Sequence, residues 1–472
     1  MADRPNNPND PNSPTAPEDR SRARPGTSAP FTGYYNRPAP ETDSLLTAVG
    51  PGAPCGEYLR RYWHPFLLAS ELKDLPIPVR LLGEDLVVFR DKSGRMGLLH
   101  RHCIHRGVSL EFGIIAERGI RCCYHGWQFD VDGTVLDTPA EPPTSRIKQN
   151  FCQGAYHLRE SHGLLFAYMG PPESVPEFPL YDSYDYPDDN RLVPFRMNLP
   201  CNWLQIVENA SDPMHNAFLH AIVSGQQFSP AFKVLPQLDY PETPLGFLSM
   251  ATRKVKDYVF IRASDIILPN VGQFPNGANT VDREGFAVRP FLTRWSVPVD
   301  DHNSFYIGVA HLNSYNGSVK SLRAEDYGVD MIPFIGQTGD RPYDERQREP
   351  GDYDAVVSQG LTANRKAEHL GTTDRGVVLI RRMLARAIAA TQAGETPAMP
   401  RLYTDGKTAR TYAHETVVRI PADAKLDDPV ALAEFGRRAA MVFVETDHLP
   451  AAERERVAEE RIRRLFETAT VA

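Results

Sequence analysis

The sequence predicts an α+β protein, in which an all-β unit precedes a mixed unit with an antiparallel sheet. Short segments with the two-residue period of strands crowd residues 79–99, and a further one follows at 163–169. Beyond about residue 176, strand-like pieces at 255–261 and 305–312 are interspersed with longer helices without strict alternation. The 472 residues are enough for two or three domains. We expect a tail at 1–42, a first domain at 43–175 and a second domain at 176–472.

Composition limits the class of protein. A hydrophobic fraction of 41% with 24% charged residues is ordinary for a soluble globular chain, and a net charge of −8 argues against nucleic acid as the main partner. No apolar run approaches the roughly 20 residues of a membrane span, and the N-terminus lacks a hydrophobic signal core. The six cysteines form no disulfide framework pattern. We therefore expect a cytoplasmic protein.

The order of elements follows from local composition. Residues 1–42 are rich in Pro, Asn, Ser and Arg and nearly devoid of aliphatic side chains, which predicts a disordered tail; a docking arm is the alternative. Order should begin near Leu45, with a short helix at 57–63. Longer helices are expected at 202–219, 374–393, 429–445 and 451–468.

One cysteine and histidine pattern dominates the first domain. Cys103 and His105 form a C-x-H pair, and Cys122 and His125 form a C-x-x-H pair; 16 residues lie between the two pairs. A [2Fe–2S] cluster of the Rieske type binds two thiolates on one iron and two imidazoles on the other. The pattern predicts this cluster, which accepts an electron more readily than an all-cysteine cluster because its ligands carry less negative charge.

Structural zinc is the main alternative for four such ligands. Zinc fingers keep each ligand type within one turn, whereas each turn here mixes a cysteine with a histidine. Glycine follows soon after each histidine, at Gly107 and Gly126, where it lets backbone approach a cluster closely. Cys123 is interpreted as a small buried neighbour. Both ligand loops are expected at the tips of hairpins in one small β-domain.

A second pattern lies within the helix expected at 202–219. Asp212, His215 and His220 form D-x-x-H-x4-H. Histidines five apart lie about 140° around an ideal helix, so both face one ion only if the helix kinks or ends between them, and Pro213 favours such an irregularity. Two imidazoles and a carboxylate with open positions form the facial triad of non-haem Fe(II) oxygenases. Together with the cluster pattern, this predicts an electron carrier and an oxygen-activating iron in one chain.

These two patterns make the chain resemble the catalytic (alpha) subunit of a Rieske non-haem iron aromatic-ring-hydroxylating oxygenase, most similar to the phthalate 4,5-dioxygenase-like branch. The resemblance covers roughly residues 43 to 385. The segments that carry it are 59–63, the two cluster pairs, 130–133, 208–220 and 368–374.

The resemblance implies a role for each motif residue. His215 and His220 would bind iron, and Asp212 would bridge from a cluster histidine of one protomer to an iron histidine of the next, in a homotrimer or a dimer of trimers. The third iron ligand is aligned backwards from 368–371 onto Asp352, with Asp354 as the alternative. Asn209 is either a residue that positions the chemistry or one that stabilises the helix.

The implied activity is oxygenation with O2 and with electrons from a separate NADH-dependent flavin and iron–sulfur reductase. An aromatic substrate, carboxylated as is typical of the branch, would be dihydroxylated on its ring. The alternatives are monooxygenation or O- or N-demethylation of a methylated aromatic and, in another class, a Rieske electron-transfer protein. The basic residues considered for a substrate carboxylate are Lys233, Arg253, Arg262 and Arg294.

Overall fold

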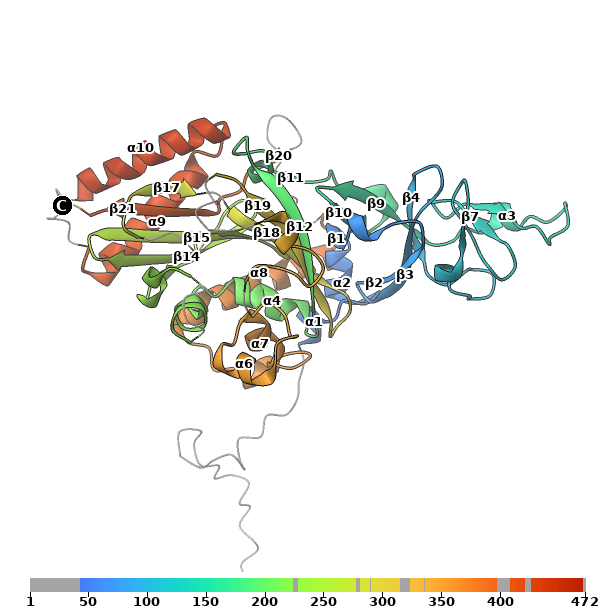
Figure 1. The fold of residues 1–472 in the computed structure, drawn as a ribbon, viewed down its shortest axis with the longest axis horizontal. Coiled ribbons are helices and arrows are strands. Elements are labelled where there is room, and N and C mark those ends of the chain that lie inside the picture. The colour runs from blue at the N-terminus through green and yellow to red at the C-terminus, as the bar shows by residue number, and fades with distance from the viewer. Residues whose placement is uncertain are drawn as a thin grey trace, which may run out of the picture.

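The computed structural model describes the chain over most of its length (Figure 1). The described residues are 43–223, 228–276, 281–288, 290–314, 323–334, 336–396, 408–420 and 426–469. The expected tail at 1–42 lies outside them. Within the described ranges, no helix is both long enough and apolar enough to cross a membrane.

A six-stranded antiparallel sheet forms the base of the N-terminal part. The chain returns to it late, because β9 and β10 insert between β4 and β1. The strand expected at 163–169 is thus confirmed, while the helix expected at 57–63 lies earlier, as α2 (Pro54–Leu59), and Trp63 already begins a strand. In spatial order the strands are β1 (Trp63–Leu68), β10 (Leu164–Tyr168), β9 (Ala155–Ser161), β4 (Met96–His100), β3 (Glu84–Arg90) and β2 (Ile77–Leu81).

A small four-stranded sheet is built from the chain between β4 and β9. It packs on one face of β3 and β4, and the core between them contains Val87, Phe89, Trp127 and the two cysteines of the predicted cluster site. The small sheet lies at the narrow end of the molecule, to the right in Figure 1. The strands are β5 (Ile114–Ile115), β6 (Ile120–Arg121), β7 (Gln128–Phe129) and β8 (Val135–Asp137), and α3 (Ile147–Asn150) follows them.

The C-terminal part is organised around a nine-stranded antiparallel sheet, which confirms the α+β class. The strand expected at 255–261 spans a turn instead: β14 ends at Val255, and Lys256, at φ +52°, turns the chain into β15. The main order is β12 (Arg191–Leu199), β19 (Ser304–Leu312), β18 (Pro290–Pro298), β16 (Val271–Pro275), β15 (Tyr258–Ile267), β14 (Gly246–Val255) and β13 (Gln237–Asp239). The remaining strands are β21 (His414–Arg419), which pairs with β15 and with β17 (Gly285–Val288), and the separate parallel pair β11 (Leu180–Tyr181) and β20 (Thr408–Ala409).

Helices connect and cover these sheets. The helix α8 (Arg375–Gln392) packs against α1 (Ser44–Thr47), α2 and α4 (Trp203–Ala210), so that one hydrophobic core runs from the N-terminal part into the C-terminal part. The helix α9 (Pro429–Glu445) packs on β13 and β14, and α10 (Ala451–Ala469) packs on α9. The shorter helices are α5 (His215–Phe218), α6 (Tyr343–Arg348) and α7 (Asp352–Val357). The predicted boundary near residue 175 stays a prediction.

Candidate functional site: two metal centres

The first candidate site consists of two turns with the same backbone pattern. The amide of Cys103 donates to the carbonyl of Val108, at 2.9 Å, and the amide of Gly107 donates to the carbonyl of Cys103, at 2.8 Å. One β-bridge between His102 and Ser109 closes this first loop. The loop therefore has the form of a tight hairpin tip, although it connects strands of two different sheets.

The second turn repeats this arrangement between β6 and β7. The amide of Cys122 donates to Trp127, at 2.8 Å, and Gly126 donates back to Cys122, at 3.1 Å. Gly107 and Gly126 have φ values of +76° and +73°, in the left-handed region where only glycine is free of strain. The need for this conformation explains the two glycines better than close approach to a cluster does.

The four side chains of the two turns divide by burial. The thiols of Cys103 and Cys122 are buried in the small core, and burial together with the neighbouring Cys122 raises the pKa of Cys103 to about 11. The rings of His105 and His125 are half-buried, with centroids 4.5 Å apart, and His105 stacks on Trp127. Two buried thiols beneath two outward imidazoles fit a [2Fe–2S] cluster whose cysteine-bound iron is inside and whose histidine-bound iron is near the surface.

Cys123 does not belong to this arrangement. Its side chain is exposed, so the interpretation as a small buried neighbour is wrong. All six cysteines are free, with Cys55 and Cys201 buried and Cys152 exposed.

The second candidate site begins where α4 ends. The expected single helix at 202–219 is interrupted: α4 stops at Ala210, a turn with Pro213 follows, and α5 starts at His215. The chain then widens into a π-helical turn at Leu219–Val223, which contains His220. Such turns redirect side chains and occur often at functional sites. The interruption and the π-turn together bring His215 and His220 to one side, with ring centroids 5.3 Å apart.

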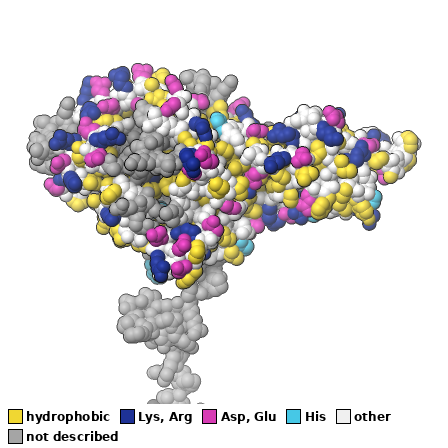
Figure 2. Space-filling view, viewed as in Figure 1, with side chains coloured by type: hydrophobic (Ala, Val, Ile, Leu, Met, Phe, Trp, Pro, Cys, Tyr) yellow, Lys and Arg dark blue, Asp and Glu magenta, His cyan; other side chains and the backbone are white. Residues whose placement is uncertain are grey.

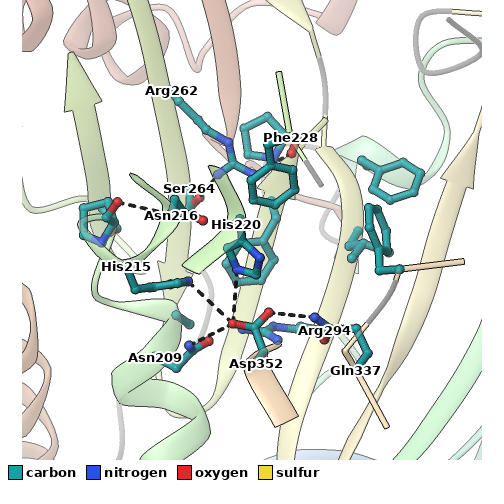
Figure 3. Close-up of a pocket in the computed structure, with 18 of the residues that line it drawn as sticks. Asn209, His215, Asn216, His220, Phe228, Arg262, Ser264, Arg294, Gln337 and Asp352 are labelled. Atoms are coloured by element: carbon teal, nitrogen blue, oxygen red, sulfur yellow. Dashed lines mark hydrogen bonds and ion pairs between the residues drawn. The ribbon is translucent and has the colours of Figure 1, made fainter. Parts of the chain in front are cut away.

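Asp352, the first residue of α7, meets the two histidines (Figure 3). Its Oδ1 lies 3.2 Å from Nε2 of His220 and 3.7 Å from Nε2 of His215. The three ligand atoms of the group all lie within 4.8 Å of one another. Two imidazoles and one carboxylate converging in this way form a suitable ligand set for a mononuclear non-haem Fe(II) ion.

Two amides hold the carboxylate of Asp352. The side chain of Gln337 donates to Oδ2, at 2.7 Å, and that of Asn209 donates to Oδ1, at 3.2 Å (Figure 3). Burial alone would raise the pKa of Asp352, but the imidazoles of His220 and His215 and the hydrogen bond from Gln337 hold that pKa well below its usual range. Gln337 was missed by sequence reasoning, because no local pattern marks a glutamine 15 residues before its partner.

Asp354 faces away from the histidines. Its carboxylate accepts hydrogen bonds from Arg346, at 2.6 Å, and from Arg341 and the amide of Gly351, each at 3.0 Å. These bonds occupy both of its oxygens. The structure therefore brings Asp352, and not Asp354, to the histidine pair.

Asp212 lies on the outer side of His215. Its Oδ2 is 3.8 Å from Nδ1 of His215, and its Oδ1 accepts from the amide of Met214. Both Asp212 and His215 line an open hollow of about 500 Å³ on the protein surface, while His215 also lines an inner cavity. His215 thus forms part of the wall between the surface hollow and the inner cavity.

The inner cavity has a volume of about 80 Å³. By the same measure one water needs roughly 10–15 Å³, so the cavity has room for a small organic molecule. It is bounded by His215, His220 and Asp352 at one side, and elsewhere its walls mix aromatic and aliphatic side chains with polar ones such as Arg262 and Arg294. The aromatic residues of these walls are Phe228, Phe274, Phe291, Tyr306 and Phe334.

The four basic residues considered for substrate lie in different surroundings. Arg262 and Arg294 line the cavity, Arg253 is buried outside its lining, and Lys233 is exposed. Arg262 is already engaged: it donates to the carbonyl of Pro275, at 2.8 Å, and to Ser264, at 3.3 Å. Sequence patterns could not distinguish these four residues.

Comparisons with known proteins agree with both centres. Residues 62–153 match the family model of the Rieske [2Fe-2S] domain. The tert-butanol monooxygenase / tert-amyl alcohol desaturase oxygenase subunit of Aquincola tertiaricarbonis is 42% identical, over 92% of this chain and 95% of its own length. The phenoxybenzoate dioxygenase subunit alpha of Ectopseudomonas oleovorans is 38% identical, over 75% and 87%.

One further relative and one solved structure extend this picture. The phthalate 4,5-dioxygenase oxygenase subunit of Pseudomonas putida is 32% identical, over 76% of this chain and 88% of its own length. Among solved structures, NdmA of Pseudomonas putida CBB5 superposes with a TM-score of 0.54 at 22% identity, over 72% of this chain and 94% of that one. The structural likeness supports the same fold.

Proposed function

This chain belongs to the Rieske non-haem iron oxygenases as an oxygenase subunit with a [2Fe–2S] cluster and a mononuclear iron, and we propose that it dihydroxylates the ring of an aromatic substrate. The observation that carries the proposal is the convergence of His215, His220 and Asp352 on an aromatic-lined cavity. The substrates are O2 and an aromatic compound, and electrons come from a separate NADH-dependent reductase. The six free cysteines are compatible with the cytoplasm, where we place the protein.

In the first site, Cys103 and Cys122 would hold the inner iron of the cluster, and His105 and His125 the outer iron. The burial of the thiols and the half-exposure of the imidazoles support this assignment. The histidine side is the side on which another protein can approach.

In the second site, His215, His220 and Asp352 would hold the iron, which when bound supplies a centre for binding and activating O2. Gln337 and Asn209 hold the carboxylate of Asp352 in place. The apolar side chains of the cavity walls orient an aromatic ring and exclude bulk water from the reaction.

We propose that the working unit is a homotrimer or a dimer of trimers. The cluster turns and the iron residues are well separated within one chain, with the small sheet at the narrow end and α4 in the broad part (Figure 1). Asp212 is 27% exposed in the surface hollow and contacts His215, so a neighbouring subunit's cluster histidine docked there would reach the iron residues through one carboxylate.

The narrow end of the molecule supports docking as well. Figure 2 shows hydrophobic side chains among the charged ones along it. The exposed large apolar side chains near the cluster turns are Ile104, Phe112, Ile114, Tyr124 and Phe151. Such a surface fits a site that is covered by a neighbouring subunit or by the reductase.

Monooxygenation, including demethylation, is the second candidate. It is favoured by the 42% identical relative, whose name describes a monooxygenase and desaturase acting on alcohols. A relative from Sphingobium sp., 33% identical, is likewise named an O-demethylase oxygenase subunit. Electron transfer alone would leave the iron ligand set and its cavity without a use.

Labelling with ¹⁸O2 tests the proposal. The holoenzyme, supplied with a reductase and NADH, is given a panel of one- and two-ring aromatic acids and their methyl ethers. We expect one product with two labelled oxygen atoms on adjacent ring carbons. Release of formaldehyde, or a product with one labelled atom, would reject ring dihydroxylation in favour of the second candidate.

A variant keeps the test specific to the iron site. His220→Ala should abolish incorporation of label while the absorption spectrum of the cluster is unchanged. Unchanged turnover in this variant would contradict the oxygenase proposal itself.

A further inference from the structure

We propose that Arg294 is the anchor for a carboxylate of the substrate, so that the cavity selects aromatic acids over neutral aromatics and neutral alcohols. The inference rests on the proposed function of the cavity. Of the four basic residues considered from the sequence for binding a substrate carboxylate, it selects Arg294.

The sheet is built to hold this arginine in the cavity wall. Arg294 lies on β18, and its cross-strand neighbours are Gly272 of β16 and Gly308 of β19. A Cβ at Gly308 would lie 2.7 Å from Cα of Arg294, and one at Gly272 would lie 2.5 Å from the ring of Phe274. Gly308 therefore lets β19 approach the backbone of β18 closely at Arg294, and Gly272 leaves room for the ring of Phe274.

Two aromatic rings fix the guanidinium. Its central carbon lies 4.4 Å from the centroid of Phe274 and 4.0 Å from that of Tyr306. Stacking of this kind holds a planar guanidinium while its edge N–H groups stay available for hydrogen bonds. The stacked arginine thus has the geometry needed for two-pronged recognition of a carboxylate.

No described residue accepts a hydrogen bond from the guanidinium of Arg294. The residue is 5% exposed, so bulk water does not solvate it. A buried charge without a partner is costly, and an anion that enters the cavity removes this cost. Arg262 differs, because Pro275 and Ser264 already accept its hydrogen bonds.

The charge of the cavity favours the same ligand. Arg262 is already paired with Glu415, at 3.6 Å, so Arg294 and the carboxylate of Asp352 are the remaining charges of the lining, and Fe²⁺ would add positive charge when bound. Burial lowers the pKa of Arg294, and the nearby Tyr306 and Asp352 only partly oppose this shift. A carboxylate on Arg294 therefore places the attached ring in the aromatic-walled cavity, beside the iron ligands.

The consequence is selectivity. A site built to hydrogen-bond one group of the substrate strongly rejects an analogue that lacks the group, because its own donors are then left unpaired. When a neutral alcohol or an unsubstituted arene is bound, the N–H donors of Arg294 remain unpaired.

Equilibrium binding to the anaerobic holoenzyme tests the proposal. Isothermal titration calorimetry compares one- and two-ring aromatic carboxylates with the matching carboxamides, which have nearly the same shape. We expect the best carboxylate to bind about 10- to 100-fold more tightly than its amide, as hydrogen bonds to a charged group allow. Arg294→Gln should abolish this preference by weakening carboxylate binding alone, and Arg294→Lys should keep part of it, because the charge remains but the fork is lost.

Arg253→Gln is the matched control, since it removes a buried arginine that does not line the cavity. It should leave the preference unchanged. The cluster spectrum and thermal unfolding of each variant verify that it is folded. If Arg294→Gln fails to fold, the wild-type preference and the Arg294→Lys variant still decide the matter.

If the wild type bound acids and amides with equal affinity, Arg294 would not be a carboxylate anchor. The same conclusion would follow if Arg294→Gln lost equal affinity for both. The ¹⁸O2 experiment separates this failure from that of the proposed function. In the wild type, label entering neutral aromatics or alcohols as readily as the matching carboxylates overturns the anchor while oxygenation stands. A carboxylate preference that depends on Arg294, with no double label in any product, supports the anchor and rejects ring dihydroxylation.

Discussion

Cys103 and Cys122 stand in two turns 19 residues apart whose backbones repeat each other, whereas His220 and Asp352 are separated by 132 residues. In the cluster site, local hydrogen bonds and two left-handed glycines shape each turn before any partner is considered. In the iron site, the ligands meet only after the second sheet and its helices have folded. The first site is encoded locally and the second by tertiary packing.

The contacts that hold each site in place also differ: they are local in the cluster site and long-range in the iron site. Each cluster turn is held by backbone groups of its own loop. The end of α4 is held by a buried ion network instead, in which Glu208 accepts from Arg365, at 2.9 Å, and from Arg381, at 2.6 Å, while Arg381 also binds Glu368. The network ties α4 to the loop before α8 and to α8 itself. We therefore expect damage to the iron site to leave the cluster intact, and long-range contacts to matter mainly for the iron site.

Replacing Asp352 should cause the largest difference in response between the iron site and the cluster site. Asp352→Ala removes the only carboxylate that faces both histidines within the described chain, so iron content should fall and turnover should drop more than the 10- to 100-fold typical of outer residues. Iron analysis and the cluster absorption spectrum are the measurements. Asp354→Ala is the control, and it should keep its iron. Loss of the cluster together with iron in Asp352→Ala would contradict the independence of the two sites.

Glu208→Gln should have the next largest effect, on stability. Its side chain is 9% exposed and sits between two arginines. Loss of its charge takes the carboxylate from buried Arg365, whereas Arg381 keeps Glu368. Removing one partner of a buried pair costs about 3–5 kcal/mol in free energy of unfolding. Denaturant unfolding measures this, with Asp85→Asn in the exposed pair Arg80–Asp85 as a control expected to lose under about 1 kcal/mol. Equal losses in both variants would show that the network does not support α4.

Gln337→Leu should weaken iron binding or turnover by about 10- to 100-fold, the range for residues that orient a metal ligand. The variant removes the hydrogen bond to Oδ2 of Asp352 and leaves that oxygen free to turn. Spectroscopy of the iron centre should show an altered coordination, and the cluster spectrum should be unchanged. An unaltered iron spectrum with reduced turnover would instead indicate that Gln337 contacts the substrate.

For the locally encoded site, the ligand spacing singled out four residues and the flanking strand pattern indicated the loop form. The structure brings these four residues together, and the predicted burial of Cys123 was wrong. Their role as cluster ligands stays a prediction. The sequence also predicted that His215 and His220 share one site and that Pro213 disturbs the helix nearby. The structure places the interruption before His215 and a π-turn at His220, while the role of both histidines as iron ligands stays a prediction. The form of the break was not predicted, since a π-turn depends on packing around Leu219–Val223 rather than on a residue signal.

Features that depend on contacts between distant parts of the chain could be predicted from the sequence only in part. Asp352 was preferred to Asp354 through the resemblance, but the reason for the choice is tertiary: Arg341 and Arg346 hold Asp354 away from the histidines. Gln337 and the glycine pair beside Arg294 have no local signature at all. Cross-strand neighbours become visible only when register is known, and register is set by the whole sheet.

Gly107→Ala should have the smallest effect and is the most direct test of local encoding. Gly107 has a φ of +76°, and a methyl group on its Cα would meet no atom within 4 Å, so the substitution changes backbone strain without a clash. A left-handed alanine costs about 1–2 kcal/mol, which thermal unfolding of the holoprotein and the rate of cluster loss should detect. Gly50→Ala is the matched control, because Gly50 also has free space but no positive φ, and it should be neutral or slightly stabilising. A neutral Gly107→Ala variant would mean that the surrounding core, and not the turn itself, fixes the position of Cys103.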